Sequence, residues 1–159
     1  MTTYIHTIYM KKILSLLVLV LAFSSCEDDA TFNNPSVQGT KDGAFWRATS
    51  SSAVVVGNTL TITAVTPFEI LTLKTSSVEP GVYTLGEDNS NAASYTFSAD
   101  GINSEYATGA GLGDGEIVVE ISPVGTVTGT FEFNAPGAGG AVLNYINGVF
   151  YHVPIQAAQ

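Results

Sequence analysis

The chain has 159 residues, of which 14 are acidic and five are lysine or arginine, so its formal net charge is −9 at pH 7. A chain this acidic repels phosphate backbones and anionic lipid headgroups, which argues against nucleic-acid binding and against membrane attachment through a basic patch. Its single cysteine rules out an intrachain disulfide, so the fold must depend on packing and hydrogen bonds.

Residues 1–25 have the pattern of a secretory signal peptide. From Met10, the expected true start, the chain has two lysines, an apolar run over residues 13–23 and two serines before its only cysteine, Cys26. This order of charged, apolar and small residues is typical of an export signal. The run would form a helix of about 16 Å, much shorter than the hydrocarbon core of about 30 Å, so it predicts a signal and not a membrane span.

Residues 21–26, LAFSSC, resemble the lipobox of bacterial lipoproteins, in which the cysteine is lipidated and becomes the first mature residue. Phe23 departs from that pattern, which prefers leucine there. The resemblance implies a membrane anchor on Cys26, which is durable when it has two or more acyl chains. A free cysteine in an ordinary signal peptide is the alternative. Cleavage before Cys26 leaves 134 residues, with three basic and 14 acidic side chains and a net charge of −11 (3 − 14).

Residues 26–40 predict a lipidated N-terminus and a tether, because they are polar and show no hydrophobic period. The acidic residues directly after Cys26 resemble the export tag of surface-exposed lipoproteins of the Bacteroidetes type. A solvated linker is the alternative. Residues 41–159 are then expected to form a single all-β domain.

From Asp42 onwards the hydrophobic period is two, which indicates strands. The predicted strands are 44–49, 54–56, 59–64, 68–75, 82–85, 94–99, 102–107, 117–121, 127–133 and 142–146. The predicted turns between them include Asp42-Gly43, Gly57-Asn58, Glu79-Pro80-Gly81, Asp100-Gly101 and residues 136–140.

Asn147-Gly148 allows two interpretations: a hairpin turn, or a bulge inside one long strand. No helical period of useful length follows the signal. We therefore expect an antiparallel meander that forms a β-sandwich or a partly open β-barrel.

A set of strand and turn motifs extends over most of residues 41–155. It consists of Lys41-Asp42-Gly43 followed by an aromatic residue and Trp46, Pro80-Gly81-x-Tyr83, TGTFEF over residues 128–133 and NGVF over residues 147–150. Together with the lipobox, these motifs resemble a family of small Bacteroidetes-type lipoproteins of unknown function. The resemblance implies a lipoprotein with a β domain and assigns no functional residues.

Catalysis is not expected. His152 is the only histidine after the signal, and the sequence lacks a Gly-x-Ser-x-Gly elbow, a His-Glu-x-x-His motif and a Walker loop. Glu116 and Glu120 would share one face of a strand and are expected to be solvated, not to act as a glycosidase pair. Residues 87–91 are rich in oxygen ligands but lack the EF-hand order, so they predict turns. We predict no catalytic residue, no cofactor and no metal.

Aromatic side chains are the remaining candidates for a site. Trp46, Tyr83, Tyr145 and Tyr151, with Tyr95 and Tyr106, could line a concave face that stacks on sugar rings or encloses a hydrophobic ligand. Packing in the core is the alternative. Exposure of these rings in one patch would favour binding, and burial would favour a structural role.

The sequence thus predicts a non-enzymatic lipoprotein of the cell envelope, in the outer membrane and facing either the periplasm or the outside. Its predicted partners are the membrane, through Cys26, and a glycan or an envelope protein. A module that binds carbohydrate or a small hydrophobic ligand is the alternative function, and a hydrolase is a distant third.

Overall fold

The computed structural model describes residues 36–120 and 124–157. These residues form eleven strands and one 3₁₀ turn, η1 (Ala138–Gly140), which confirms the all-β prediction. Within this part of the chain, no helix has the length and apolar character to cross a membrane. The predicted signal peptide, residues 1–25, and the predicted lipid anchor, Cys26, lie outside the described residues.

The strands are separated mainly by short turns. In chain order they are β1 (Ser36–Lys41), β2 (Ala44–Arg47), β3 (Ser50–Val56), β4 (Thr59–Val65), β5 (Glu69–Thr75), β6 (Gly81–Leu85), β7 (Ala92–Ala99), β8 (Ile102–Ala107), β9 (Asp114–Glu120), β10 (Thr126–Pro136) and β11 (Val142–Gln156).

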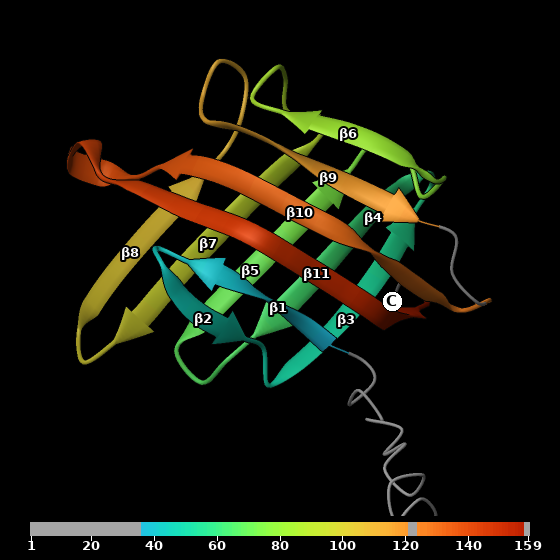
Figure 1. The fold of residues 1–159 in the computed structure, drawn as a ribbon, viewed down its shortest axis with the longest axis horizontal. Coiled ribbons are helices and arrows are strands. Elements are labelled where there is room, and N and C mark those ends of the chain that lie inside the picture. Colours follow the sequence, from blue (N-terminus) through green and yellow to red (C-terminus); the bar gives the residue numbers. More distant parts are fainter. Residues whose placement is uncertain (1–35, 121–123, 158–159) are drawn as a thin grey trace, which may run out of the picture. The chain divides into compact units, whose positions relative to one another are not determined.

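All eleven strands belong to one sheet, in the order β6-β9-β10-β11-β3-β4-β5-β7-β8, with β1 beside β11 and β2 beside β1. The sheet curls into an open half-barrel, so the partly open barrel is the correct one of the two predicted architectures. In Figure 1 a front arm, formed by β1, β2, β6, β9, β10 and β11, lies across a back arm, formed by β3, β4, β5, β7 and β8. The two arms share one core of buried side chains.

The connection between the arms departs from a pure antiparallel meander. β11 pairs with β3 in parallel, with Ile155 opposite Ala53 and Gln156 opposite Val54. Every other strand pair in the described residues is antiparallel. This short parallel contact joins the C-terminal end of the front arm to the first strand of the back arm.

The first strand begins earlier than the sequence indicated. β1 lies almost entirely within residues 26–40, which were predicted to be a tether, so that prediction is wrong for residues 36–40 and the domain starts before residue 41. β1 pairs with β11 on one side and with β2 on the other. The strand shows no apolar alternation in the sequence, because Val37 is its only large apolar residue and Gly39 occupies its other buried position.

β11 is one strand of 15 residues with two bulges. Asn147 has φ +52°, and the pairing with β10 shifts there, so Asn147-Gly148 is a bulge and not a hairpin turn. His152 has φ +48° at the second shift. Because bulges bend a strand and increase its twist, these two sites help β11 to curl from the front arm towards β3.

Tyr145 lies at the centre of an aromatic cluster in the core. Its ring is fully buried and stacks on Phe133 at 5.3 Å between centroids. Phe131 is tilted against it at 5.5 Å, and Trp46 meets it edge-on at 5.7 Å. These aromatic side chains fill the interior of the front arm.

Glycines lie opposite several of these rings in neighbouring strands. Gly148 is paired with Phe131, and Gly129 is paired with Phe150. A Cβ atom at Gly148 would lie 2.6 Å from the Phe131 ring and 2.5 Å from its carbonyl oxygen. The rings therefore occupy space that only glycine leaves open.

Candidate functional site

The structure does not bring the four predicted aromatic candidates to one face. Trp46 is 6% exposed and Tyr145 is fully buried, and their rings are in contact in the core. Tyr83 is half-buried and its hydroxyl donates to the Glu79 carbonyl at 2.5 Å. Tyr151 is half-buried and stacks on His152 at 4.0 Å. The expectation of a shared ligand face is therefore wrong for these residues, and for Trp46 and Tyr145 the core-packing alternative holds.

A polar cluster around Glu69 is the main charged feature next to this core. Lys41 of β1 forms an ion pair with Glu69 at the start of β5. The Tyr95 hydroxyl, from β7, donates to Glu69 Oε1 at 2.5 Å, and Trp46 Nε1, from β2, donates to Oε2 at 2.7 Å. Lys41 Nζ also donates to the Tyr95 hydroxyl at 2.5 Å. The cluster thus links the front arm to the back arm through one carboxylate.

The turn between β4 and β5 holds this carboxylate in place. Thr66 Oγ1 donates to Glu69 Oε2 at 3.0 Å and accepts from the Glu69 backbone N–H at 3.1 Å. The Thr66 backbone N–H donates to the Glu69 carbonyl at 2.9 Å. Sequence analysis did not identify Glu69 as a site residue. The available signal was one carboxylate directly before the apolar residues at the start of a strand.

The surroundings of Glu69 favour its charged form. Burial acts to raise the pKa of Glu69, but hydrogen bonds from Lys41, Tyr95, Trp46 and Thr66 outweigh it and lower the pKa to about 2. For Tyr95, burial raises the pKa well above its ordinary value, and the hydrogen bond to Glu69 raises it further. At neutral pH the cluster therefore holds a charged carboxylate and a neutral tyrosine hydroxyl.

The Tyr145 hydroxyl is buried beside this cluster and has no hydrogen-bond partner among the described residues. Burial raises the pKa of Tyr145 above its ordinary value, and the negative charges of Glu69 and Asp42 act in the same direction. The hydroxyl therefore stays protonated. Its ring packing, described above, accounts for its position.

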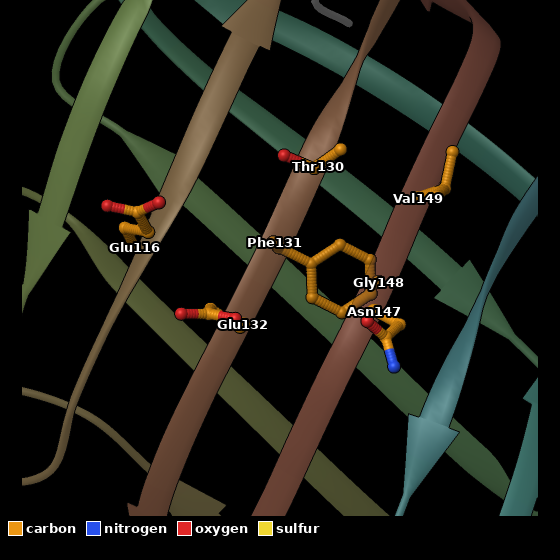
Figure 2. Close-up of a pocket in the computed structure, with 7 residues that line it drawn as sticks. All are labelled: Glu116, Thr130, Phe131, Glu132, Asn147, Gly148 and Val149. Carbon is orange, nitrogen blue, oxygen red and sulfur yellow. The ribbon is translucent and has the colours of Figure 1, made fainter.

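A shallow cleft lies on the outer surface of the front arm. Figure 2 shows Glu116 of β9 and Glu132 of β10 side by side, with Asn147 at the bulge of β11. Glu116 and Glu132 are directly opposite each other in the two strands, whereas Glu120 lies opposite Thr128. Like charges in directly opposed positions destabilise a sheet. The cleft thus pairs Glu116 with a different carboxylate from the one that the sequence suggested.

The oxygen-rich residues 87–91 use their side chains to accept backbone hydrogen bonds, one within a turn and two from other loops. Asp88 Oδ1 accepts from the Ser90 backbone N–H at 2.7 Å, and Asn89 Oδ1 accepts from the Ala110 N–H at 3.1 Å. Asn91 Oδ1 accepts from the Ser76 N–H at 2.9 Å. In the described part of the chain, no group of three or more His, Cys, Asp or Glu side chains is placed to hold a metal ion.

A second groove, of about 460 Å³, lies where β7, β8 and η1 meet. Phe97, Tyr106 and Ala138 supply its apolar lining. The rest of the lining is polar and consists of Thr96, Ser98, Asn103, Ser104 and Glu105. A backbone bridge between Tyr106 and Gly137 holds the β10–η1 connection against β8. Of the six aromatic residues considered from the sequence, Tyr106 is the one that lines this groove.

The residues that form the half-barrel are also the residues that match a protein-family model. A family model described as a domain of unknown function (DUF6252) matches residues 33–154. The searches of curated proteins and of solved structures found no match.

Proposed function

Since the chain belongs to the family of the domain of unknown function DUF6252, which assigns no activity, we propose a function from its own residues. The protein is a lipid-anchored, non-enzymatic component of the cell envelope, located in the outer membrane. Its half-barrel has a structural or binding role.

The observation that carries this proposal is the lipobox-like sequence of residues 21–26 and the short sequence distance between Cys26 and the first strand. Cys26 precedes Ser36, the first residue of β1, by ten positions, a distance of at most about 36 Å for an extended chain. An acyl anchor on Cys26 would therefore hold the domain close to the bilayer surface. The net charge of −11 after cleavage disfavours direct contact with anionic headgroups, so attachment depends on the lipid.

A non-enzymatic role is supported by the state of the part-buried carboxylate of Glu69. Glu69 accepts hydrogen bonds from four side chains and has a pKa of about 2. A general base works best with a pKa near the operating pH and a free lone pair. The Glu69 cluster is therefore suited to holding strands together and poorly suited to proton transfer.

Mass spectrometry of the protein extracted from its native membranes tests the anchor. We expect a mature chain that begins at Cys26 and carries acyl chains on that residue. The Cys26→Ala variant should lose the acyl mass and leave the membrane fraction or accumulate as precursor. Phe23→Leu, which restores the preferred lipobox residue, is the matched control and should remain lipidated. An unmodified Cys26, or release of the wild-type protein into the medium, would contradict the proposal.

Binding of a carbohydrate or a small hydrophobic ligand is the second candidate function. The four predicted aromatic residues do not support it, because two of them are core residues. The feature that favours it is the groove between β7, β8 and η1, because two aromatic residues, Phe97 and Tyr106, line it.

A further inference from the structure

We propose that the outer surface of the front arm is the interface of a homodimer whose two-fold axis runs over β11. This inference concerns assembly, so it goes beyond the proposed envelope role and does not depend on the lipid anchor. The occupant of the surface is a second copy of the chain, because the surface carries complementary side chains at equivalent positions on either side of β11.

The strand order makes the front arm symmetric about β11. The order β9-β10-β11 continues through β1 to β2, so two strands lie on each side of β11. A rotation of 180° about an axis parallel to β11 therefore places β2 of one copy across β9 of the other, and β1 across β10. Each contact in such an interface occurs twice, since both copies contribute the same surface.

A row of outward side chains crosses these five strands at one level. From β9 to β2 the directly opposed residues of this row are Val118, Thr130, Val149, Gln38 and Arg47. The residues that precede and follow them along the strands are mostly buried, which places the whole row on the outer surface. Arg47 therefore lies at one margin of this surface, two strands from β11.

The charges at the two margins are complementary. Arg47 is exposed and forms no ion pair in the described part of the chain. Glu116 and Glu132 lie opposite each other in β9 and β10, and neither forms an ion pair there. Within one copy, β2 is three strand spacings from β10, about 14 Å, which exceeds the combined reach of Arg47 and Glu132. The rotation brings Arg47 of each copy to β9 of the other, next to Glu116.

Apolar side chains lie at the centre of the surface. Ile146 of β11 is 41% exposed and points outwards, because Tyr145 before it is buried in the core. Val149 points to the same side, so both residues lie on the axis and pack against their counterparts in the other copy. Phe45 of β2 is 71% exposed and adds apolar surface on the same face. An apolar centre with charged margins is the usual composition of a protein interface.

The length of the side chains matches the shape of the surface. Because the sheet curls into a half-barrel, its outer face is convex, and two copies approach most closely along β11. Packed sheets are about 10 Å apart at closest approach, and the gap widens towards β2 and β9. Ile146 and Val149 lie at the closest approach. The longer side chains of Phe45, Arg47 and Glu116 lie where the gap is wider.

Sedimentation velocity of the full-length chain, purified in detergent with micelles in large excess over protein, measures the Kd of the dimer. Arg47→Glu and Glu116→Arg each place like charges opposite each other across the interface. Each substitution alone should therefore raise the Kd about tenfold or more. An equimolar mixture of the two variants should recover a heterodimer with a Kd close to that of the wild type, because each copy then supplies the opposite charge to the other.

Lys74→Glu is the matched control, because it makes the same change of charge in β5 of the back arm, where Lys74 donates to the Asn89 carbonyl. This variant should dimerise as the wild type does, and thermal melts establish that all the proteins are folded.

A folded wild type that stays monomeric would overturn the proposal, including one that instead binds another protein or lipid vesicles through this surface. Equal weakening by Arg47→Glu and Lys74→Glu, or a mixture that does not recover the dimer, would also overturn it. Acylation of Cys26 is measured by mass spectrometry on the same sample, so failure of the anchor and failure of the dimer are separate results.

Discussion

Glu69 joins separate parts of the chain through one side chain. Lys41 and Trp46 approach it from the β1–β2 hairpin, and Tyr95 approaches it from β7. An isolated carboxylate in this position would be costly, because burial disfavours its charge. The hydrogen bonds that the surrounding side chains donate to Glu69 outweigh the free-energy cost of burying its charge. The residue therefore stabilises the contact between the two arms.

Replacing Glu69 with Gln should destabilise the protein by about 1–3 kcal/mol at pH 7, because the ion pair and its charge-assisted hydrogen bonds are lost. The folded-state pKa of Glu69 is lowered from 4.5 to about 2, so its contribution is complete above about pH 4.5 and is lost as the pH falls towards 2. Urea denaturation at a series of pH values measures both effects. The wild type should lose more stability than Glu69→Gln over this interval.

Glu120→Gln is the control for that measurement, because Glu120 is exposed, lies opposite Thr128 and forms no ion pair among the described residues. Its pH dependence should follow that of the wild type. Equal slopes for the wild type and Glu69→Gln between pH 4.5 and 2 would show that the cluster does not stabilise the fold.

Gly129 tests the close packing of glycines against aromatic rings. A Cβ there would lie 1.9 Å from the Val118 carbonyl oxygen and 2.4 Å from the Phe150 ring. Gly129→Ala should therefore destabilise the protein by about 1–3 kcal/mol in chemical denaturation. Gly81→Ala is the matched control in β6, because its Cβ would meet only the Tyr83 ring at 3.9 Å. A similar small effect of both substitutions would argue against this packing.

At the scale of elements, β11 decides the shape of the sheet. It pairs with β10 along most of its length, with β1 over its middle and with β3 at its C-terminal end. One straight strand could not meet all three partners in this way. The two bulges supply the bend, and both place a non-glycine residue at positive φ.

Asn147 provides a direct test of the first bulge. A β-branched residue at φ +52° is strained, so Asn147→Val should destabilise the protein by about 1–2 kcal/mol. Asn147→Gly should be close to neutral or stabilising, because glycine adopts positive φ without a steric penalty. Thermal melts of the two variants give the comparison. Equal stability of Asn147→Val and the wild type would contradict the assigned bulge.

The ends of the sheet are protected against pairing with other chains. β6 is an end strand of five residues, and the Asn91 side chain donates to the Thr84 carbonyl at 3.2 Å. β8 ends the main path of the sheet on the other side, and Tyr106 in it is bridged by Gly137, whereas β2, a strand of four residues, ends the branch through β1. Short or covered edges limit aggregation through strand addition.

At the scale of the described domain, the two arms share one core, and the first and last strands of the domain pair with each other. β1 pairs with β11, so Ser36 lies opposite Tyr151. Neither arm can bury its inner face without the other. The arms are therefore expected to fold as one unit.

We predict a single cooperative unfolding transition for the half-barrel. Fluorescence of Trp46 reports on the front arm, and far-UV circular dichroism reports on the whole sheet, so their urea transitions should coincide. Two separated transitions would show that the arms are independently stable.

The sequence by itself determined the class of the fold and most of its strands. Alternation of apolar and polar residues predicted the strands, and turn residues such as Asp42-Gly43 and Asp100-Gly101 predicted the hairpins, because both signals are local. The polar β1 was missed, because its stability comes from pairing with β11 and not from its own composition.

Only the tertiary structure decided between sandwich and half-barrel, between turn and bulge at Asn147-Gly148, and between exposed and buried at Trp46 and Tyr145. Each choice depends on which strand lies next to which, and that information is not contained in a local pattern. The same reason applies to the Glu69 cluster and to the groove between β7, β8 and η1. The members of the Glu69 cluster lie far apart in the sequence and meet because the sheet curls, and Ala138 reaches the β7–β8 hairpin in the same way.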